Sequence, residues 1–363
     1  MNDKIIRADM PEDVLDGRLG ELSLSRLGRF PLAYSWCALV TAAGALVPRG
    51  SSAIRTNLYC CLVGPPGSGK TQSNENVFQL LDMWPQHPVL IKGKYGSAEG
   101  LVERLQDVEP NASRLIAVDE LGHLMTKAAI ERSSFPFILN SAYYEDAHSG
   151  GSKGHQYQLD CRLSITGGLV EDAFGDAFGL ATMGGLYDRF IFGLCPNPHE
   201  FLYRPFEGSH ESLNPFPALV HSEIWEARDQ WIKDGISPRV AEHALRVAYI
   251  CACVDGRPSL RADQLGPALA LAKYQTKVRV VLAPNPGENP DARCAIAVRG
   301  WLNENAAGGR LVRRRDLSKG IHYERYGPGV FNRCLNNLMF NGEIELGPNG
   351  KTVRLVCAEE TEA

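Results

Sequence analysis

The stretch Gly64-Pro65-Pro66-Gly67-Ser68-Gly69-Lys70-Thr71 lies between an apolar run, Tyr59 to Val63, and a segment with helical character, Gln72 to Leu81. The spacing of its glycines, lysine and hydroxyl residue is that of a phosphate-binding loop between a strand and a helix. Glycines let successive backbone N–H groups point at phosphate oxygens, and the amino terminus of the helix favours the same anion. A glycine-rich turn that binds nothing is the alternative, and the flanking strand and helix argue against it.

This motif assigns chemistry to its last two residues. The Lys70 ammonium is expected to reach the β- and γ-phosphates of ATP, and the Thr71 hydroxyl is expected to ligate Mg²⁺. The expected cofactor-binding residues are Gly64, Pro65, Pro66, Gly67, Ser68, Gly69, Lys70 and Thr71.

A second apolar run, Leu115 to Val118, ends in two carboxylates about 50 residues after the loop. Asp119 is expected to hold Mg²⁺ through its water shell, and Glu120 to polarise the water that attacks the nucleotide. The alternative is an ordinary strand that ends in a solvated acidic turn. The preceding phosphate-binding loop favours the catalytic interpretation.

Apolar runs that favour strands alternate with helical segments between Asn57 and about Leu202. This alternation predicts an α/β fold with a mainly parallel sheet and crossover helices. The expected strands are 58–63, 89–91, 115–118, 163–166 and 190–194; the expected helices are 31–47 and, after a less regular region at 203–235, 237–255 and 261–283.

Residues 284–290 are rich in proline, asparagine and glycine, which predicts a linker. The segment after it, 291–357, has the order helix, short basic turn, helix and two strands around Gly347-Pro348-Asn349-Gly350. This order suits a winged helix-turn-helix.

Two polar residues beside expected strands are further candidates. Thr166 ends the strand 163–166, where it could sense phosphate or orient water, although threonine is at home in any strand. Arg189 precedes the strand 190–194, and its planar donor fork suits phosphate oxygens. The alternative is a surface arginine paired with Asp188.

Together, the phosphate-binding loop, Asp119-Glu120, Asp188-Arg189-Phe190 and the helical segment that opens at Ser237-Pro238-Arg239 resemble the minichromosome-maintenance-like branch of the AAA+ ATPases. The stretch Gly93 to Leu101 is similar to the segment that leads into this branch's helix-2 insertion. The chain also resembles helicase-like ATPases carried by plasmids, phages and integrated elements. The resemblance covers about residues 30–357.

The resemblance implies a three-layer AAA+ core, a helical lid and a carboxy-terminal winged helix. It also implies that Arg189 is an arginine finger for the neighbouring subunit's nucleotide, that Arg239 is the second sensor, and that Thr166 is the first sensor, where the family more often has asparagine. A pore hairpin with a basic residue corresponds to Ser149 to Tyr157, with Lys153 as the candidate; an incidental lysine in a glycine loop is the alternative. The expected divisions are an amino-terminal helical segment at 1–50, the core at 51–235, the lid at 236–287 and the winged helix at 291–357.

The net charge of −4 argues against a protein that coats nucleic acid, but the charge is unevenly distributed. Residues 291–358 hold eleven basic and six acidic side chains, a net +5, so the rest of the chain carries −9. A basic face of this kind binds phosphates without regard to sequence. The candidates for contact with DNA or RNA there are Arg313, Arg314, Arg315 and Arg333. Protein contact by the same module is the alternative.

Cysteine usage and hydropathy indicate the cellular compartment of the protein. The ten cysteines form no C-x-x-C pair and lie mostly in apolar stretches, which predicts small buried hydrophobes in a reducing compartment. No apolar run approaches the roughly 20 residues that span a bilayer. We therefore expect a cytoplasmic protein without a membrane partner.

These observations and the resemblance predict an ATP-hydrolysing motor that assembles as a homo-oligomeric ring, a hexamer, and separates the strands of DNA during replication of a plasmid, phage or mobile element. Its expected partner is single-stranded or forked DNA. A second hypothesis is an ATP-dependent switch: a loader, a transposition helper or a defence ATPase that acts on a partner without unwinding DNA. A third is a nucleotide-binding adaptor without turnover, and Glu120 argues against it.

Overall fold

The computed structural model describes residues 8–356 apart from short gaps, which are residues 51, 85, 93–97, 107–111, 129–134, 145–146, 153–154, 179–184, 196–205, 283–289, 307–309 and 341–342. The chain divides into two compact units, Met1–Ala283 and Pro284–Ala363. The expected linker at 284–290 lies almost entirely outside the described residues.

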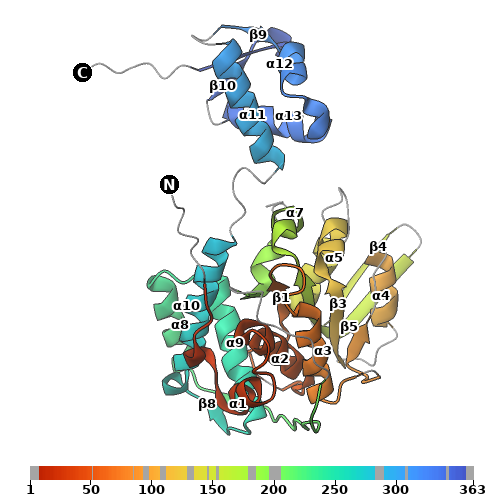
Figure 1. Ribbon diagram of the computed structural model, residues 1–363, viewed down its shortest axis with the longest axis vertical. Helices are drawn as coiled ribbons and strands as arrows, with labels where there is room; N and C mark the ends of the chain where they lie inside the picture. Colours follow the sequence, from red (N-terminus) through yellow and green to blue (C-terminus); the bar gives the residue numbers. More distant parts are fainter. Residues whose placement is uncertain are drawn as a thin grey trace. The chain divides into compact units, whose positions relative to one another are not determined.

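A mainly parallel sheet forms the centre of the first unit (Figure 1). Its strand order is β2-β3-β5-β1-β6, and β4 pairs antiparallel with the first part of β5. All five expected strands are present, although β5 is far longer than expected. The bounds are β1 (Tyr59–Val63), β2 (Leu90–Lys92), β3 (Ala112–Glu120), β4 (Ala147–Ser152), β5 (His155–Leu169) and β6 (Phe190–Leu194).

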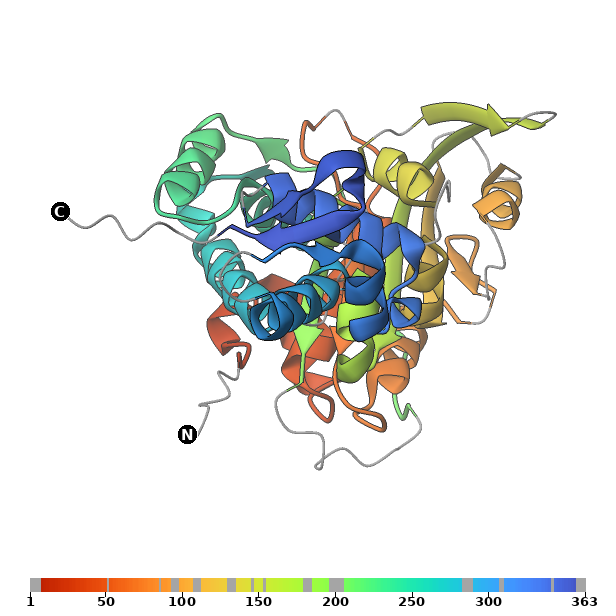
Figure 2. The ribbon, with the colours of Figure 1, turned by 90° about the horizontal axis from the view of Figure 1, so that it is seen from above.

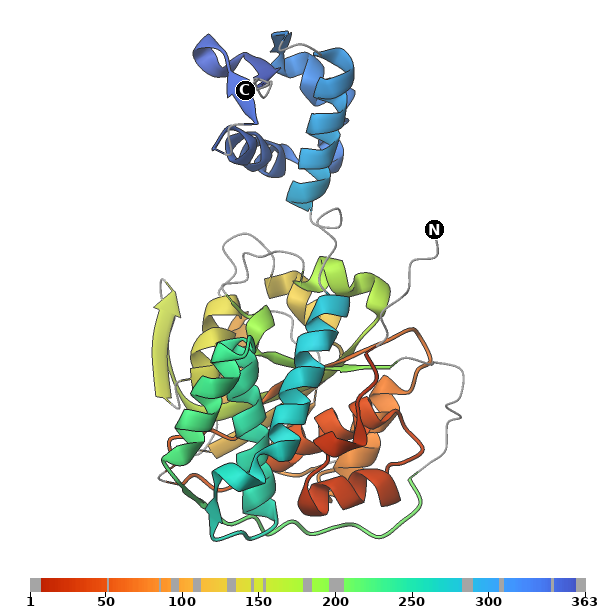
Figure 3. The ribbon, with the colours of Figure 1, turned by 90° about the vertical axis from the view of Figure 1, so that its left-hand side faces the viewer.

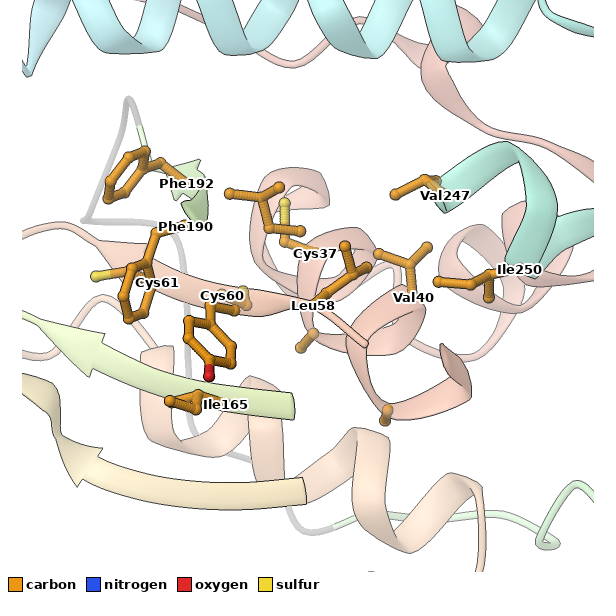
Figure 4. Packing of buried hydrophobic residues seen from close by; sticks show 14 of the residues in the cluster. Cys37, Val40, Leu58, Cys60, Cys61, Ile165, Phe190, Phe192, Val247 and Ile250 are labelled. Atoms are coloured by element: carbon orange, nitrogen blue, oxygen red, sulfur yellow. The ribbon is translucent and has the colours of Figure 1, made fainter. Parts of the chain in front are cut away.

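The buried faces of these strands explain their composition. Every residue of β1 is buried, as in a parallel strand that is covered on both sides. In Figure 4, Cys60 and Cys61 of this strand lie among side chains of α2, β5 and β6. The nine described cysteines are all buried and none of them forms a disulfide, which confirms their predicted use as small hydrophobic residues.

Helices from both ends of the first unit share one hydrophobic core with the sheet. Figure 3 shows α1 and α2, in red, beside α9 and α10, in green to cyan. The expected divisions at residues 50 and 235 therefore lie within one compact unit. The helices are α1 (Gly17–Ser25), α2 (Leu32–Leu46), α3 (Lys70–Leu80), α4 (Ala98–Gln106), α5 (Leu121–Ala128), α6 (Phe135–Tyr144), α7 (Phe174–Phe178), α8 (Glu223–Lys233), α9 (Pro238–Val254) and α10 (Gly266–Val281).

Local sequence explains where several of these helices begin. The Ser237 hydroxyl accepts the Val240 N–H and Pro238 occupies the first turn, so α9 has a standard amino-terminal cap. Helix α8 lies in the region expected to be less regular, and its Ile224 and Trp231 are buried. A short parallel pair joins β7 (Leu219–Val220) to β8 (Ser259–Leu260).

The second unit has its own core and a small antiparallel sheet with the order β10-β11-β9. The expected basic turn is in fact a short helix, α12, with Asp316 in its first turn and Lys319 in its last, which suits the helix dipole. The elements are α11 (Pro290–Asn305), β9 (Val312–Arg313), α12 (Arg314–Gly320), α13 (Pro328–Phe340), β10 (Ile344–Leu346) and β11 (Thr352–Leu355). Within the described ranges, no helix of either unit has the length and apolar character needed to cross a membrane.

Candidate functional site

The loop between β1 and α3 has the backbone shape that the motif predicts. Gly67 and Gly69 adopt φ values of 77° and 86°, in the left-handed region that favours glycine. The Gly64 N–H donates to the Leu169 carbonyl at the end of β5, so the loop is anchored to the sheet. No atom lies within 4 Å of the place where a Cβ on Gly67 would be, so the middle of the loop is open.

Lys70 turns back into the loop that precedes it. Its ammonium donates to the carbonyl oxygens of Gly64 and Pro65, each at 2.7 Å, and lies 3.3 Å from the Ser68 hydroxyl. Partial burial lowers the pKa of this ammonium below its ordinary value. A cation held against two carbonyls is ready to move to a stronger anionic acceptor, because a charged acceptor makes the stronger hydrogen bond.

A buried tyrosine from the amino-terminal helices supports this loop. The Tyr34 hydroxyl, on α2, donates to the Val63 carbonyl at 2.8 Å and lies 3.1 Å from the Ser68 hydroxyl. A Cβ on Gly64 would lie 2.1 Å from the Tyr34 oxygen, so a larger residue cannot occupy that position unless something shifts. Sequence reasoning missed Tyr34 because nothing in α2 beyond its apolar character indicates a contact with the loop.

The two carboxylates lie where β3 loses its regular pairing with β5. The register shifts between Val118 and Glu120, and both Asp119 and Glu120 are exposed. The exposed Glu120 carboxylate lies 3.3 Å from Nε2 of His123 on α5. Both carboxylates are therefore accessible at the carboxyl edge of the sheet.

Gly168, near the end of β5, brings the lysine and the carboxylates together. A Cβ on this glycine would lie 3.2 Å from the Lys70 Cβ and 3.3 Å from the Asp119 carbonyl oxygen. Its backbone pairs with Glu120. The structure therefore places Lys70, Asp119 and Glu120 at one edge of the sheet. Gly168 lies beside them, two residues beyond the strand that the sequence predicts.

Thr166 is not on the surface of this site. It is fully buried, three residues before the end of β5, and its hydroxyl donates to Asn74 Oδ1 on α3 at 2.8 Å. The side chain therefore ties the central strand to the helix behind the loop. In this arrangement it offers no group to a phosphate, and its expected sensing role stays a prediction.

Arg189 lies at the amino ends of strands β1 and β6, whereas Lys70 lies beyond the carboxyl end of β1. Arg189 precedes Phe190, which pairs with Tyr59 at the amino end of β1, whereas the loop follows the carboxyl end of that strand. A strand of this length spans roughly 16 Å, at about 3.3 Å per residue. Arg189 is therefore far from the loop of its own chain. The exposed carboxylate of its neighbour Asp188 lies 3.6 Å from a different arginine, Arg279.

Arg189 and Arg239 meet on one aromatic ring. Their guanidinium carbons lie 5.1 Å and 4.9 Å from the Tyr144 centroid, and burial lowers the pKa of Arg189. Glu242 accepts hydrogen bonds from Arg239 at 2.7 Å and Arg246 at 2.6 Å. The proposed finger and second sensor thus share one cluster, at the edge of the sheet away from the loop.

The candidate residues for nucleic-acid contact are Lys153 of the predicted hairpin and four arginines of the second unit. Figure 2 shows the predicted hairpin, formed by β4 and the start of β5, extending from the first unit. Lys153 lies outside the described residues. Arg313 ends β9, Arg314 and Arg315 begin α12, and Arg333 is exposed on α13 of the second unit.

Comparison with known proteins adds no assignment. No family model matches this sequence, and a search of curated proteins found no match either. Among the described residues, no group of three or more His, Cys, Asp or Glu side chains could hold a metal ion by itself. Function is therefore argued from the site.

Proposed function

We propose that this protein is a ring-forming P-loop ATPase of the AAA+ class that uses ATP hydrolysis to move along DNA. The observation that carries the proposal is the meeting of Lys70, Asp119 and Glu120 at the carboxyl edge of a parallel sheet. The strand order β2-β3-β5-β1-β6 and the helices α9 and α10 support an AAA+ core and lid, and the element order of the second unit supports a winged helix.

The residues of the loop fit ATP and Mg²⁺. Open backbone around Gly67, two left-handed glycines and a partly buried ammonium form a cradle for a phosphate chain. The exposed Thr71 hydroxyl and Asp119 carboxylate supply the oxygen ligands that Mg²⁺ prefers. When bound, Mg²⁺ neutralises charge on phosphate oxygens.

The side chains of this chain have separate tasks in hydrolysis. Lys70 leaves its two carbonyl partners to hold phosphate oxygens, because a charged acceptor makes the stronger hydrogen bond. The exposed Glu120 carboxylate orients the attacking water and accepts its proton. Arg189 stands at the far edge of the sheet, so any charge it supplies must go to the nucleotide of another subunit. This geometry favours a ring, which we propose is a hexamer.

ATPase assays test the first part of the proposal. We expect Lys70→Ala and Glu120→Gln each to abolish turnover, with Glu120→Gln still binding ATP. Lys277→Ala, an exposed lysine on α10, is the matched control and should keep full activity. Turnover that survives in Lys70→Ala would contradict the proposal.

Motion on DNA is tested separately. Single-stranded DNA should stimulate ATP hydrolysis, and forked duplexes should come apart in the presence of ATP. If hydrolysis is intact but neither effect occurs, the motor assignment is wrong and an ATP-dependent switch is the better description.

A further inference from the structure

The second unit contains a pocket that the ATPase site does not use. Its volume is about 580 Å³, which lies in the range of pockets that hold a nucleotide-sized ligand. We call it the arginine pocket. Its walls include Arg313, Arg314, Arg315, Lys351, Tyr323 and Phe331, and none of the described residues that line it is acidic.

Separate elements bring these cations together. The Arg314 N–H donates to the Lys351 carbonyl, which fixes the start of α12 against the turn between β10 and β11. Arg313 pairs with Thr352 across the β9–β11 ladder. The basic side chains are thus gathered by the backbone pairing of the small sheet, at an electrostatic cost that a bound anion would relieve.

The pocket cations differ from two other arginines of this unit, Arg299 and Arg354, in their partners. Arg299 is ion-paired with Glu343 at 2.6 Å, and Arg354 is ion-paired with Glu345. Among the residues that the structure describes, no carboxylate forms an ion pair with Arg313, Arg315 or Lys351. These three cations are exposed and available to an anion.

The pocket also offers flat stacking surfaces. The Arg314 guanidinium lies 5.6 Å from the centroid of the buried Phe331 ring. The half-buried Tyr323 ring lies 5.8 Å from Phe331. Asn332, an exposed amide on the same wall, accepts a hydrogen bond from Arg314 at 2.5 Å. Guanidinium and tyrosine planes stack on nucleobases, and an amide can bond to a base edge.

We propose that the arginine pocket holds an unpaired nucleotide of single-stranded DNA. The base stacks against Tyr323 and Arg314, and the flanking phosphates lie on Arg313, Arg315 and Lys351. Bases of an intact duplex are stacked on one another, so a duplex can use the cations but not the stacking surfaces. The inference rests on the proposed function, which makes DNA the polymer, and it assigns the strand form that this unit prefers.

The test measures binding of the full-length protein to a labelled thymidine oligonucleotide of about 20 nucleotides and to a duplex of equal length. Tyr323→Leu should weaken single-strand binding about 5- to 100-fold, the loss typical of one stacked base, and leave duplex binding unchanged. Tyr323→Phe should bind as the wild type does. Tyr326→Leu, the matched control, removes a nearby half-buried ring that does not line the pocket.

A second variant keeps the test decisive if Tyr323→Leu does not fold. Arg315 is exposed, so Arg315→Gln should leave the fold intact. It should weaken single-strand binding and lower the salt slope by about 0.7. Arg354→Gln, which removes an ion-paired arginine, should have the smaller effect.

The outcomes separate this inference from the proposed function. If the wild type binds single strands and its ATPase responds to them, but the pocket variants bind equally well, only the pocket inference is wrong. Equal losses on single strands and duplexes in Tyr323→Leu would also overturn it. A wild type that hydrolyses ATP but binds no DNA would overturn both the pocket inference and the DNA motor.

Discussion

At the scale of a single residue, the Tyr34 hydroxyl links α2 to the loop for which we propose nucleotide binding. Tyr34→Phe removes the hydrogen bonds to the Val63 carbonyl and the Ser68 hydroxyl, although the Val63 carbonyl keeps the Cys195 N–H at 3.2 Å. A lost buried hydrogen bond costs about 0.5–1.5 kcal/mol. If this free-energy cost falls on the phosphate-binding loop and weakens its hold on ATP, KM for ATP should rise about 2- to 10-fold with little change in kcat. Steady-state ATPase kinetics measures both constants.

A matched hydroxyl on the same helix supplies the control. The buried Thr41 hydroxyl donates only within α2, to the Cys37 carbonyl, so Thr41→Val should leave KM unchanged. Gly64→Ala should abolish ATP binding because its Cβ meets the Tyr34 oxygen, and adding Tyr34→Phe should restore part of it. Independent effects of these two substitutions would show that Tyr34 does not act through the loop.

His243 should make stability depend on pH. This side chain is fully buried on α9, and burial together with the charges of Arg279, Arg246 and Arg239 lowers its pKa well below the ordinary 6.5. Below about pH 6.5, His243 therefore binds a proton in the unfolded chain, whereas in the folded chain it stays neutral down to its lowered pKa. The free energy of unfolding should fall as pH falls, by up to about 1.4 kcal/mol per unit, until the folded pKa is reached.

Urea denaturation between pH 7.5 and 5.5 checks this slope. His243→Gln should flatten the dependence, whatever it does to stability at a single pH. His221→Gln, in the partly exposed turn before α8, should keep the wild-type slope. Equal slopes in the wild type and His243→Gln would rule out this source of pH dependence.

At the scale of elements, strand β5 shows how far the sequence could lead. The expected strand ended at Thr166, which Gly167 and Gly168 follow. The strand in fact continues to Leu169, since a Cβ on Gly167 would lie 2.6 Å from the Val118 carbonyl and one on Gly168 would crowd Lys70. Residues from other elements leave little space for a side chain at these two positions, and a single sequence does not reveal such neighbours.

Elsewhere too, features with a strong local pattern could be predicted, and features that depend on distant contacts could not. The loop, the two carboxylates and the core strands have strong local patterns, namely motif spacing and apolar runs, and the structure brings them together. Helices α8 and α12 were missed because polar residues dominate them and their few apolar side chains contact other elements. The stacking of Arg189 and Arg239 on Tyr144 also joins residues from three distant segments.

The end of β5 yields a prediction at this scale. Gly168→Ala adds a Cβ 3.2 Å from the Lys70 Cβ, a tight contact that must displace the lysine by a few tenths of an ångström. Overpacking of this kind costs about 1 kcal/mol or more, so ATP affinity should fall at least about fivefold while the strand remains folded. Fluorescent-nucleotide titration and thermal melting measure the two effects. Gly266→Ala, at a glycine with open space, should change neither, and equal affinity in both variants would contradict the packing argument.

At the scale of the whole molecule, the sheet separates the ATPase residues into two half-sites. Lys70 and Glu120 belong to its carboxyl edge and Arg189 to its amino edge, so the proposed ATPase site needs the arginine of a second chain. Arg189→Ala should lower turnover by about 10³- to 10⁵-fold, as the loss of an arginine finger does elsewhere. In a ring, this loss should be repaired by a neighbour that still carries the arginine.

Mixed assemblies test that repair directly. Rings made from equal amounts of Arg189→Ala and Lys70→Ala chains should regain up to about a quarter of wild-type turnover, the share of interfaces in which an intact loop meets an intact arginine. Rings made from Lys70→Ala and Glu120→Gln chains are the control: both lesions fall on the same half-site, so no interface is complete and activity should stay absent. Native mass spectrometry would establish that the chains mix. If mixed rings form and the first pair gains nothing over the second, Arg189 does not act on a neighbouring subunit, and its place on Tyr144 serves the fold alone.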